Sequence, residues 1–239
     1  MVSSVGYVVC TEERETLMKF RNFIWDFDGC LCDSYPHTTQ VFFDAMTRPD
    51  IDHGGRAEAP VWDELFRRLQ VTWVYAREQY RVTEAENRYI RDHESDFTYS
   101  PVPVMFPGIP EVLAEIKGAG GQNFLYTLRE STAIRKLEAE GLADLFTDFV
   151  VRENGFPGKP KPDAVLYLME KHGLNPAETV MIGDRDLDGQ SGINAGASGC
   201  LLTWLDKNCH GEDPLAVTAM PYKCRGIEQF RSLMLGGEK

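Results

Sequence analysis

The chain has 239 residues, a mass of 27.0 kDa and a formal net charge of −12 at pH 7. Because 43% of its residues are apolar and 26% are charged, the composition is that of a folded globular protein and excludes disordered and fibrous classes. An acidic chain repels nucleic acid and anionic membranes, so we expect neither as a partner, and no apolar run is long enough to predict a membrane span.

Residues 1–17 precede the first predicted strand, and we expect them to form an N-terminal extension, disordered and outside the folded domain. The apolar stretch 5–10 has no preceding Lys or Arg and is followed by acidic residues, which is atypical of a secretory signal. We therefore expect a cytoplasmic protein whose six cysteines are buried free thiols, because disulfide frameworks belong to oxidising compartments.

Short apolar runs alternate with helical patterns over most of the remaining chain. Strands are predicted at 23–25, 123–126, 149–151, 179–182 and 200–202. Helices are predicted at 109–117, 131–140, 163–172 and 186–195. This alternation is typical of an α/β fold, a Rossmann-like parallel sheet with helices on both faces, in which ligands bind at the carboxyl ends of the strands.

Residues 35–100 interrupt the alternation with four helical patterns, at 37–46, 61–69, 72–80 and 83–96. Thr83 and Glu86 have the spacing of a capping box at the start of the last helix. A proline-rich stretch at 101–108 has the composition of a linker. We therefore predict a helical domain of residues 35–100, inserted into an α/β core domain of residues 18–34 and 101–239.

Carboxylates follow two of the predicted strands directly. Asp26 and Asp28 come after the first strand, and Asp184 and Asp188 follow the strand at 179–182. A polar loop or the first turn of a helix explains either pair alone, because both places tolerate acidic residues. In a parallel sheet the two pairs would converge at one edge, where carboxylates repel one another unless a cation lies between them. Hard oxygen ligands of this kind favour Mg²⁺.

A hydroxyl and two cations occupy further loop positions. Thr127 ends the strand at 123–126, and Lys159 and Lys161 lie in a proline-flanked loop before the helix at 163–172. Taken singly, a β-branched strand terminus and two solvated lysines are ordinary features. The order of acid, acid, hydroxyl, lysine and acid along the chain is the more informative observation.

This ordered set resembles four motifs of the haloacid dehalogenase-like (HAD) phosphatases. The segment 26–34 is similar to their first motif, Thr127 to the second, the Lys-Pro-Lys-Pro segment at 159–162 to the third, and 183–188 to the fourth. The helical insertion is similar to their C1 cap domain, and the phosphoglycolate phosphatase-like branch is the nearest resemblance. One departure is Cys30, which stands where the family usually has Thr.

The resemblance implies a phosphatase that acts on a small phosphorylated metabolite, phosphoglycolate-like or a sugar phosphate. It implies that Asp26 is the nucleophile that forms an aspartyl-phosphate and that Asp28 is the general acid and base. It also implies that Thr127, Leu128 and Lys159 bind the transferring phosphoryl group.

The same resemblance implies a Mg²⁺ cofactor. The metal would be held by Asp26, Asp184 and the main-chain carbonyl of Asp28, with Asp188 orienting the metal shell or Lys159. No lysine lies between Lys19 and Lys117, so the Schiff-base chemistry of phosphonate-cleaving relatives has no nucleophile here. All cations of the predicted cap are arginines, and one of them could bind a second anionic group of the substrate.

Two alternatives remain open at the level of sequence. A phosphosugar mutase similar to β-phosphoglucomutase would share the cap and both aspartates of the first motif, and it would return the phosphoryl group to a sugar. A phosphate-dependent switch protein, similar to response-regulator receivers, would keep a stable aspartyl-phosphate. The sequence names neither the substrate nor the oligomeric state.

Overall fold

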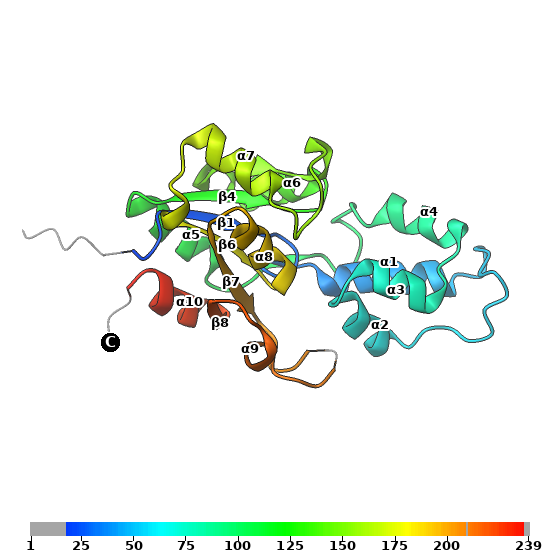
Figure 1. Cartoon of the computed structure of the whole chain (residues 1–239). Coiled ribbons are helices and arrows are strands. Elements are labelled where there is room, and N and C mark those ends of the chain that lie inside the picture. Colours follow the sequence, from blue (N-terminus) through cyan, green and yellow to red (C-terminus); the bar gives the residue numbers. More distant parts are fainter. Residues whose placement is uncertain (1–17, 209, 237–239) are drawn as a thin grey trace, which may run out of the picture.

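The computed structural model describes residues 18–208 and 210–236, so the predicted N-terminal extension, 1–17, lies outside the described residues. A six-stranded sheet with the order β5-β4-β1-β6-β7-β8 forms the centre of the molecule, and its strand pairs are parallel (Figure 1). The strands are β1 (Asn22–Trp25), β4 (Gln122–Tyr126), β5 (Phe146–Val150), β6 (Thr179–Gly183), β7 (Ser198–Thr203) and β8 (Tyr222–Arg225). The α/β, Rossmann-like fold class predicted from the sequence is confirmed.

Strand β1 lies in the interior of the sheet and is buried on both faces. Phe23 and Trp25 belong to one hydrophobic cluster, whereas Ile24 belongs to the other, as the two-residue period of a strand requires. A strand covered on both faces is mostly apolar, and the run of Phe23, Ile24 and Trp25 was therefore visible in the sequence.

Helices cover both faces of the sheet. Helices α5 (Ile109–Gly118), α6 (Thr132–Ala139) and α10 (Gly226–Met234) pack on the face of Trp25, and α7 (Asp163–His172) packs on the face of Ile24. The remaining core elements are α8 (Asp186–Asn194), α9 (Pro214–Val217), η1 (Ala143–Leu145), η2 (Arg152–Asn154) and η3 (Pro176–Glu178). Helix α7 has the bounds that the sequence predicted.

Four helices lie to one side of the sheet and form the inserted cap (Figure 1). They are α1 (Tyr35–Thr47), α2 (Trp62–Leu69), α3 (Trp73–Tyr80) and α4 (Glu84–His93). Their apolar faces meet in a hydrophobic cluster of their own, which includes Phe42, Leu65 and Ile90. The capping box is present, because the Thr83 hydroxyl accepts the Glu86 N–H and the Glu86 carboxylate accepts the Thr83 N–H. The boundaries at residues 35 and 100 stay a prediction.

The two chain segments that join the cap to the core run side by side. Strand β2 (Cys32–Asp33) pairs antiparallel with β3 (Val104–Met105), with Cys32 opposite Met105. The N–H of Phe106 also donates to the Leu31 carbonyl at 3.0 Å. The cap is therefore attached through one short two-stranded ribbon, next to the first catalytic motif predicted from the sequence.

Four cysteines, Cys30, Cys32, Cys200 and Cys224, are buried free thiols, which confirms the prediction for these positions. Cys10 and Cys209 lie outside the described residues. Within 18–208 and 210–236, no helix has the length and apolar character needed to cross a membrane.

Candidate active site

The carboxyl ends of three adjacent strands bring the predicted site residues to one edge of the sheet. Asp26 directly follows β1, Thr127 directly follows β4, and Asp184 directly follows β6. Because Trp25 is in register with Leu125 on one side and Ile182 on the other, the three strands end at the same level. This is the edge at which open parallel sheets bind ligands.

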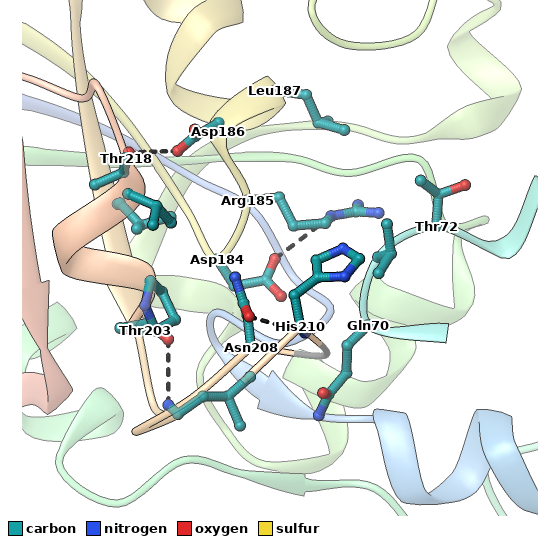
Figure 2. A pocket seen from close by; sticks show the side chains of 15 residues that line it. Gln70, Thr72, Asp184, Arg185, Asp186, Leu187, Thr203, Asn208, His210 and Thr218 are labelled. Atoms are coloured by element: carbon teal, nitrogen blue, oxygen red, sulfur yellow. Dashed lines mark hydrogen bonds and ion pairs between the residues drawn. The ribbon is translucent and has the colours of Figure 1, made fainter. Parts of the chain in front are cut away.

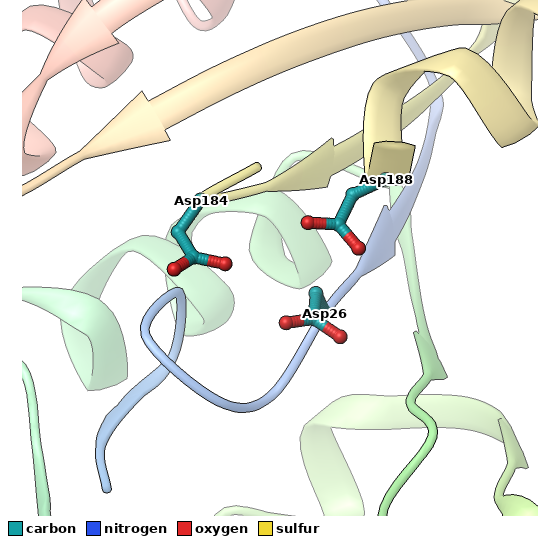
Figure 3. A group of neighbouring side chains, drawn as sticks. All are labelled: Asp26, Asp184 and Asp188. Carbon is teal, nitrogen blue, oxygen red and sulfur yellow. The ribbon is translucent and has the colours of Figure 1, made fainter. Parts of the chain in front are cut away.

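Asp26, Asp184 and Asp188 form a compact acidic cluster (Figure 3). Each carboxylate offers one oxygen, and these three oxygens lie within 4.8 Å of one another. Asp26 Oδ2 and Asp184 Oδ1 are buried and accept no hydrogen bond from any described residue. Buried carboxylate oxygens that accept no hydrogen bond, within a cluster this compact, are suitable ligands for a hard divalent cation. The residues present therefore fit Mg²⁺.

The electrostatics of the cluster lead to the same conclusion. Burial raises the pKa of Asp26 to about 6; the Lys159 ammonium works against this rise, and the Asp188 carboxylate adds to it. Burial likewise raises the pKa of Asp184 to about 8, opposed by Arg185 and reinforced by the two neighbouring carboxylates. A divalent cation at this point would offset the burial and the mutual repulsion that hold protons on these acids.

Lys159 points into the cluster. Its ammonium lies 2.5 Å from Asp26 Oδ1 and 2.9 Å from Asp188 Oδ1, and its side chain is fully buried. Burial opposes the charged form, but the Asp188 and Asp26 carboxylates outweigh it and raise the pKa of Lys159 above its usual value. Lys161, two residues further along the loop, is exposed. The loop thus offers one of its two lysines to the site.

Asp28 lies apart from the acidic cluster, in an ion pair with Arg129. Arg129 Nη2 is 2.8 Å from Asp28 Oδ1 and Arg129 Nε donates to Asp28 Oδ2 at 3.0 Å, while the Ser34 hydroxyl donates to Asp28 Oδ1 at 2.5 Å. Burial would raise the pKa of Asp28, but Arg129 and Ser34 outweigh it and hold the pKa below its ordinary value. Asp28 is therefore a carboxylate in this arrangement.

Arg129 is a site residue that the sequence interpretation missed. Its main-chain N–H donates to the Thr127 hydroxyl at 3.0 Å, and its Nη1 donates to the Glu94 carbonyl, at the end of the cap, at 3.0 Å. The buried Arg129 side chain thus connects the end of the cap with Asp28. The only signal in the sequence was a cation two residues after Thr127.

Thr127 and Leu128 occupy different environments although they are adjacent. Thr127 is buried at the end of β4. The Leu128 side chain is 36% exposed, and its carbonyl accepts a hydrogen bond from Arg152 Nε at 2.7 Å. Leu128 lines the same cavity as Asp28 and Lys159, whereas the structure does not bring the Thr127 side chain into that lining.

Tyr35 bonds to Asp184 and Gly29 leaves room for it, and neither was assigned such a role from the sequence. The Tyr35 hydroxyl donates to Asp184 Oδ2 at 2.8 Å. Gly29 has φ +76°, and a Cβ built there would lie 2.4 Å from both Asp184 Oδ2 and the Tyr35 ring. Only glycine combines this left-handed backbone with this close approach.

Two cavities flank Arg185, between the cap and the core. One, of about 350 Å³, is lined by Asp28, Leu128 and Lys159 from the core and by Trp73 and Arg77 from α3, and we call it the cap–core cavity. The other, of about 470 Å³, lies on the side of β7 (Figure 2). Its lining includes Gln70, Thr72, Asp184, Thr203 and His210. Asp184 is thus the member of the acidic cluster that lines a cavity at the boundary between cap and core.

Comparison with known proteins identifies the family. The model of the haloacid dehalogenase-like hydrolase family matches residues 23–201, which is more than half of the chain. The chain belongs to this family of hydrolases, as the order of its motifs predicted. A phosphoglycolate phosphatase of Vibrio vulnificus (strain CMCP6) is 30% identical over 232 residues, which cover 92% of this chain and 98% of the relative.

Two further relatives support the family and the fold. The pyrophosphatase PpaX of Oceanobacillus iheyensis is 24% identical over 199 residues, covering 80% of this chain and 87% of the relative. The crystal structure of a predicted phosphoglycolate phosphatase from Haemophilus somnus 129pt superimposes with a TM-score of 0.71 and 20% identity, covering 91% of this chain and 97% of that one. At this identity the structural likeness shows the fold.

Proposed function

We propose that the protein is a Mg²⁺-dependent phosphatase that hydrolyses a small phosphorylated metabolite, phosphoglycolate-like or a sugar phosphate, through an aspartyl-phosphate on Asp26. The observation that carries the proposal is the buried cluster of Asp26, Asp184 and Asp188. Lys159 contacts both Asp26 and Asp188. The similarity to a phosphoglycolate phosphatase of Vibrio and a pyrophosphatase of Oceanobacillus supports phosphate ester or anhydride hydrolysis.

Mg²⁺ would be held by Asp26, Asp184 and the main-chain carbonyl of Asp28. When bound, it supplies positive charge that reduces the repulsion between the Asp26 carboxylate and a phosphate dianion. Asp188, which contacts Lys159, keeps the ammonium beside Asp26. Lys159 then stabilises the charge that the transferring phosphoryl group carries, and Thr127 and Leu128 are assigned to binding the same group.

Proton transfer is assigned to Asp28. In the first half-reaction an Asp26 oxygen bonds to phosphorus, the ester P–O bond breaks, and the leaving oxygen takes a proton from Asp28. In the second, Asp28 takes a proton from water, the water oxygen bonds to phosphorus, and the Asp26–phosphorus bond breaks. The ion pair with Arg129 favours the carboxylate form that the second half-reaction uses. Donation in the first half-reaction requires Asp28 to leave Arg129.

We also propose a cytoplasmic location and a metabolite as the partner. The four buried free thiols support a reducing compartment.

The direct test is a screen of phosphorylated metabolites with Mg²⁺, scored by the phosphate released. We expect wild-type protein to release phosphate from one or a few esters, and Asp26→Asn to release none above background. The proposal fails if no ester is hydrolysed, or if Asp26→Asn is as active as wild type.

A further inference from the structure

Cations outnumber acids in the lining of the cap–core cavity, although the chain as a whole is acidic. Five cations line it, namely Arg77, Arg129, Arg152, Lys159 and Arg185, against the three acids Asp28, Glu94 and Glu130. Such a local excess of positive charge attracts an anionic ligand into the cavity against the overall charge of −12.

Four of the five cations already face protein groups. Arg129 pairs with Asp28, and Lys159 pairs with Asp26. Arg185 Nε lies 3.7 Å from Asp184 Oδ1, and Arg152 donates to the Leu128 carbonyl and lies 3.7 Å from Glu94. Arg77 differs, because its guanidinium makes no hydrogen bond or ion pair with any residue of 18–208 and 210–236; its Nε is buried without a partner.

Aromatic rings hold Arg77 in this position. Its guanidinium carbon lies 5.6 Å from the centre of the Phe42 ring and 5.9 Å from that of the Trp73 ring, distances at which a cation is attracted to the ring face. Burial lowers the pKa of Arg77; Glu94 opposes this effect, and Arg152 reinforces it. A half-buried cation without an anion is costly, and a ligand that carries the missing anion would remove that cost.

Building on the proposed function, we propose that Arg77 binds a second anionic group of the substrate, a carboxylate or a second phosphate, and thereby selects phosphate monoesters that carry such a group. The scissile phosphate would lie at Asp26 and Lys159 in the core, and the second anion would meet the cap at α3. The planar guanidinium can donate two parallel hydrogen bonds to either anion, which a neutral substituent cannot accept in the same way.

A purely structural role for Arg77 makes different predictions. Glu94 Oε2 is buried without a hydrogen-bond partner, so Arg77 could serve only to balance the charge of Glu94. In that case the loss of Arg77 would lower stability and affect every substrate to the same degree. The comparison of substrates with and without a second anion therefore separates the two roles.

The test measures kcat and KM, with Mg²⁺ present, for three esters. Phosphoglycolate carries a carboxylate, ethyl phosphate replaces it by a methyl group, and 1,2-ethanediol bisphosphate carries a second phosphate. The variants are Arg77→Met and, as a matched control, Arg88→Met, which removes an exposed cation from α4 of the same cap. Thermal unfolding of each variant reports any loss of stability.

We expect wild-type protein to prefer at least one of the two anionic esters over ethyl phosphate. Arg77→Met should lower kcat/KM for that ester by about 10–100-fold, mainly through KM, as expected for one charged hydrogen bond. It should leave ethyl phosphate within a few-fold of wild type, and Arg88→Met should leave all three within a few-fold. If the loss is confined to phosphoglycolate, the second anionic group of the substrate is a carboxylate; if it is confined to the bisphosphate, that group is a phosphate.

Two results overturn this proposal and leave the proposed function intact. One is a wild-type enzyme that hydrolyses esters without preferring an anionic one. The other is an Arg77→Met variant that loses the same factor on ethyl phosphate as on the anionic esters, or loses nothing on any. An absence of Mg²⁺-dependent hydrolysis of every ester would overturn the proposed function itself, and this proposal with it.

Discussion

Replacement of Lys159 by alanine tests the geometry of the site, because the neighbouring Lys161 provides a matched control. Both lysines precede a proline in the same loop, so the chain offers two chemically similar residues two positions apart. Lys159 contacts Asp26 and Asp188 in the interior, whereas Lys161 is exposed. Of the two lysines, we therefore expect only Lys159 to stabilise the charge of the transferring phosphoryl group.

The expected effects differ greatly between the two variants. Loss of one preorganised donor at a reacting oxyanion typically lowers kcat by about 10²–10³-fold, and we expect Lys159→Ala to fall in that range. Removing one partner of a buried ion pair also costs roughly 3–5 kcal/mol of stability, because the remaining carboxylates are left uncompensated. Lys161→Ala removes an exposed charge, so it should change kcat and stability little.

The assay is steady-state kinetics at saturating Mg²⁺, together with the free energy of unfolding from denaturant titration. If Lys159→Ala loses activity only because it unfolds, conditions that keep it folded will restore kcat, and the catalytic assignment will be wrong. The reverse ranking, with Lys161→Ala the more damaged variant, would show that the lysine motif has been placed two residues out of register.

Treatment with a chelator should abolish turnover and Mg²⁺ should restore it; turnover at full rate after chelation would refute the metal site. In metal-free protein the ionisation of Asp26 and Asp184, with pKa values raised to about 6 and about 8, opposes folding. The contribution of the two protonated acids to stability is complete below the ordinary carboxyl pKa and is lost as the pH rises through these values. The melting temperature of the metal-free protein should therefore fall from pH 5 to pH 8, and Mg²⁺ should reduce that fall. A metal-free melting temperature that rises over this range would contradict the prediction. Asp28→Asn keeps the nucleophile and the main-chain metal ligand, so it should lower turnover by about 10²–10⁴-fold while Mg²⁺ binding, measured by calorimetry, survives; a variant within a few-fold of wild type would refute the proton-transfer role. The cap should close over the sheet edge when a phosphate analogue binds, bending at the β2–β3 ribbon; crystal structures in several packings with an unchanged cap position would contradict this.

The sequence predicted those elements whose burial leaves a local pattern. Strands β1 and β6 are buried along their length, so their apolar runs were read correctly. Strand β5 lies at one edge of the sheet and carries the half-buried Asp148. Only its last part is a continuous apolar run, so the sequence predicted a strand at 149–151, whereas the structure has it at 146–150. Strand β8, at the other edge, alternates polar and apolar residues over four positions and was missed.

For the site, the motifs placed Asp26, Asp28, Asp184 and Lys159 correctly at strand ends or in loops, whereas Asp188 lies in the first turn of α8. The partners of these residues were not visible in the sequence. Arg129 reaches Asp28 across 101 positions in the sequence, and Tyr35 reaches Asp184 across 149. Contacts of this range are created by the crossover connections of the sheet and leave no spacing that one sequence can reveal. The separation of Asp28 from the acidic cluster, with Arg129 as its partner, therefore became visible only in three dimensions.

If Asp26 carries the phosphoryl group during turnover, chemical trapping will detect it on that residue. The Asp28→Asn protein would be mixed with Mg²⁺ and 4-nitrophenyl phosphate, whose leaving group needs little protonation, so that the intermediate forms while its hydrolysis is slow. Acid quenching, reduction with borohydride and peptide mass spectrometry then report an acyl phosphate as homoserine. We expect homoserine at position 26 in the Asp28→Asn protein and none in Asp26→Asn. A burst of nitrophenol without homoserine at position 26, or with the modification at another residue, would contradict it.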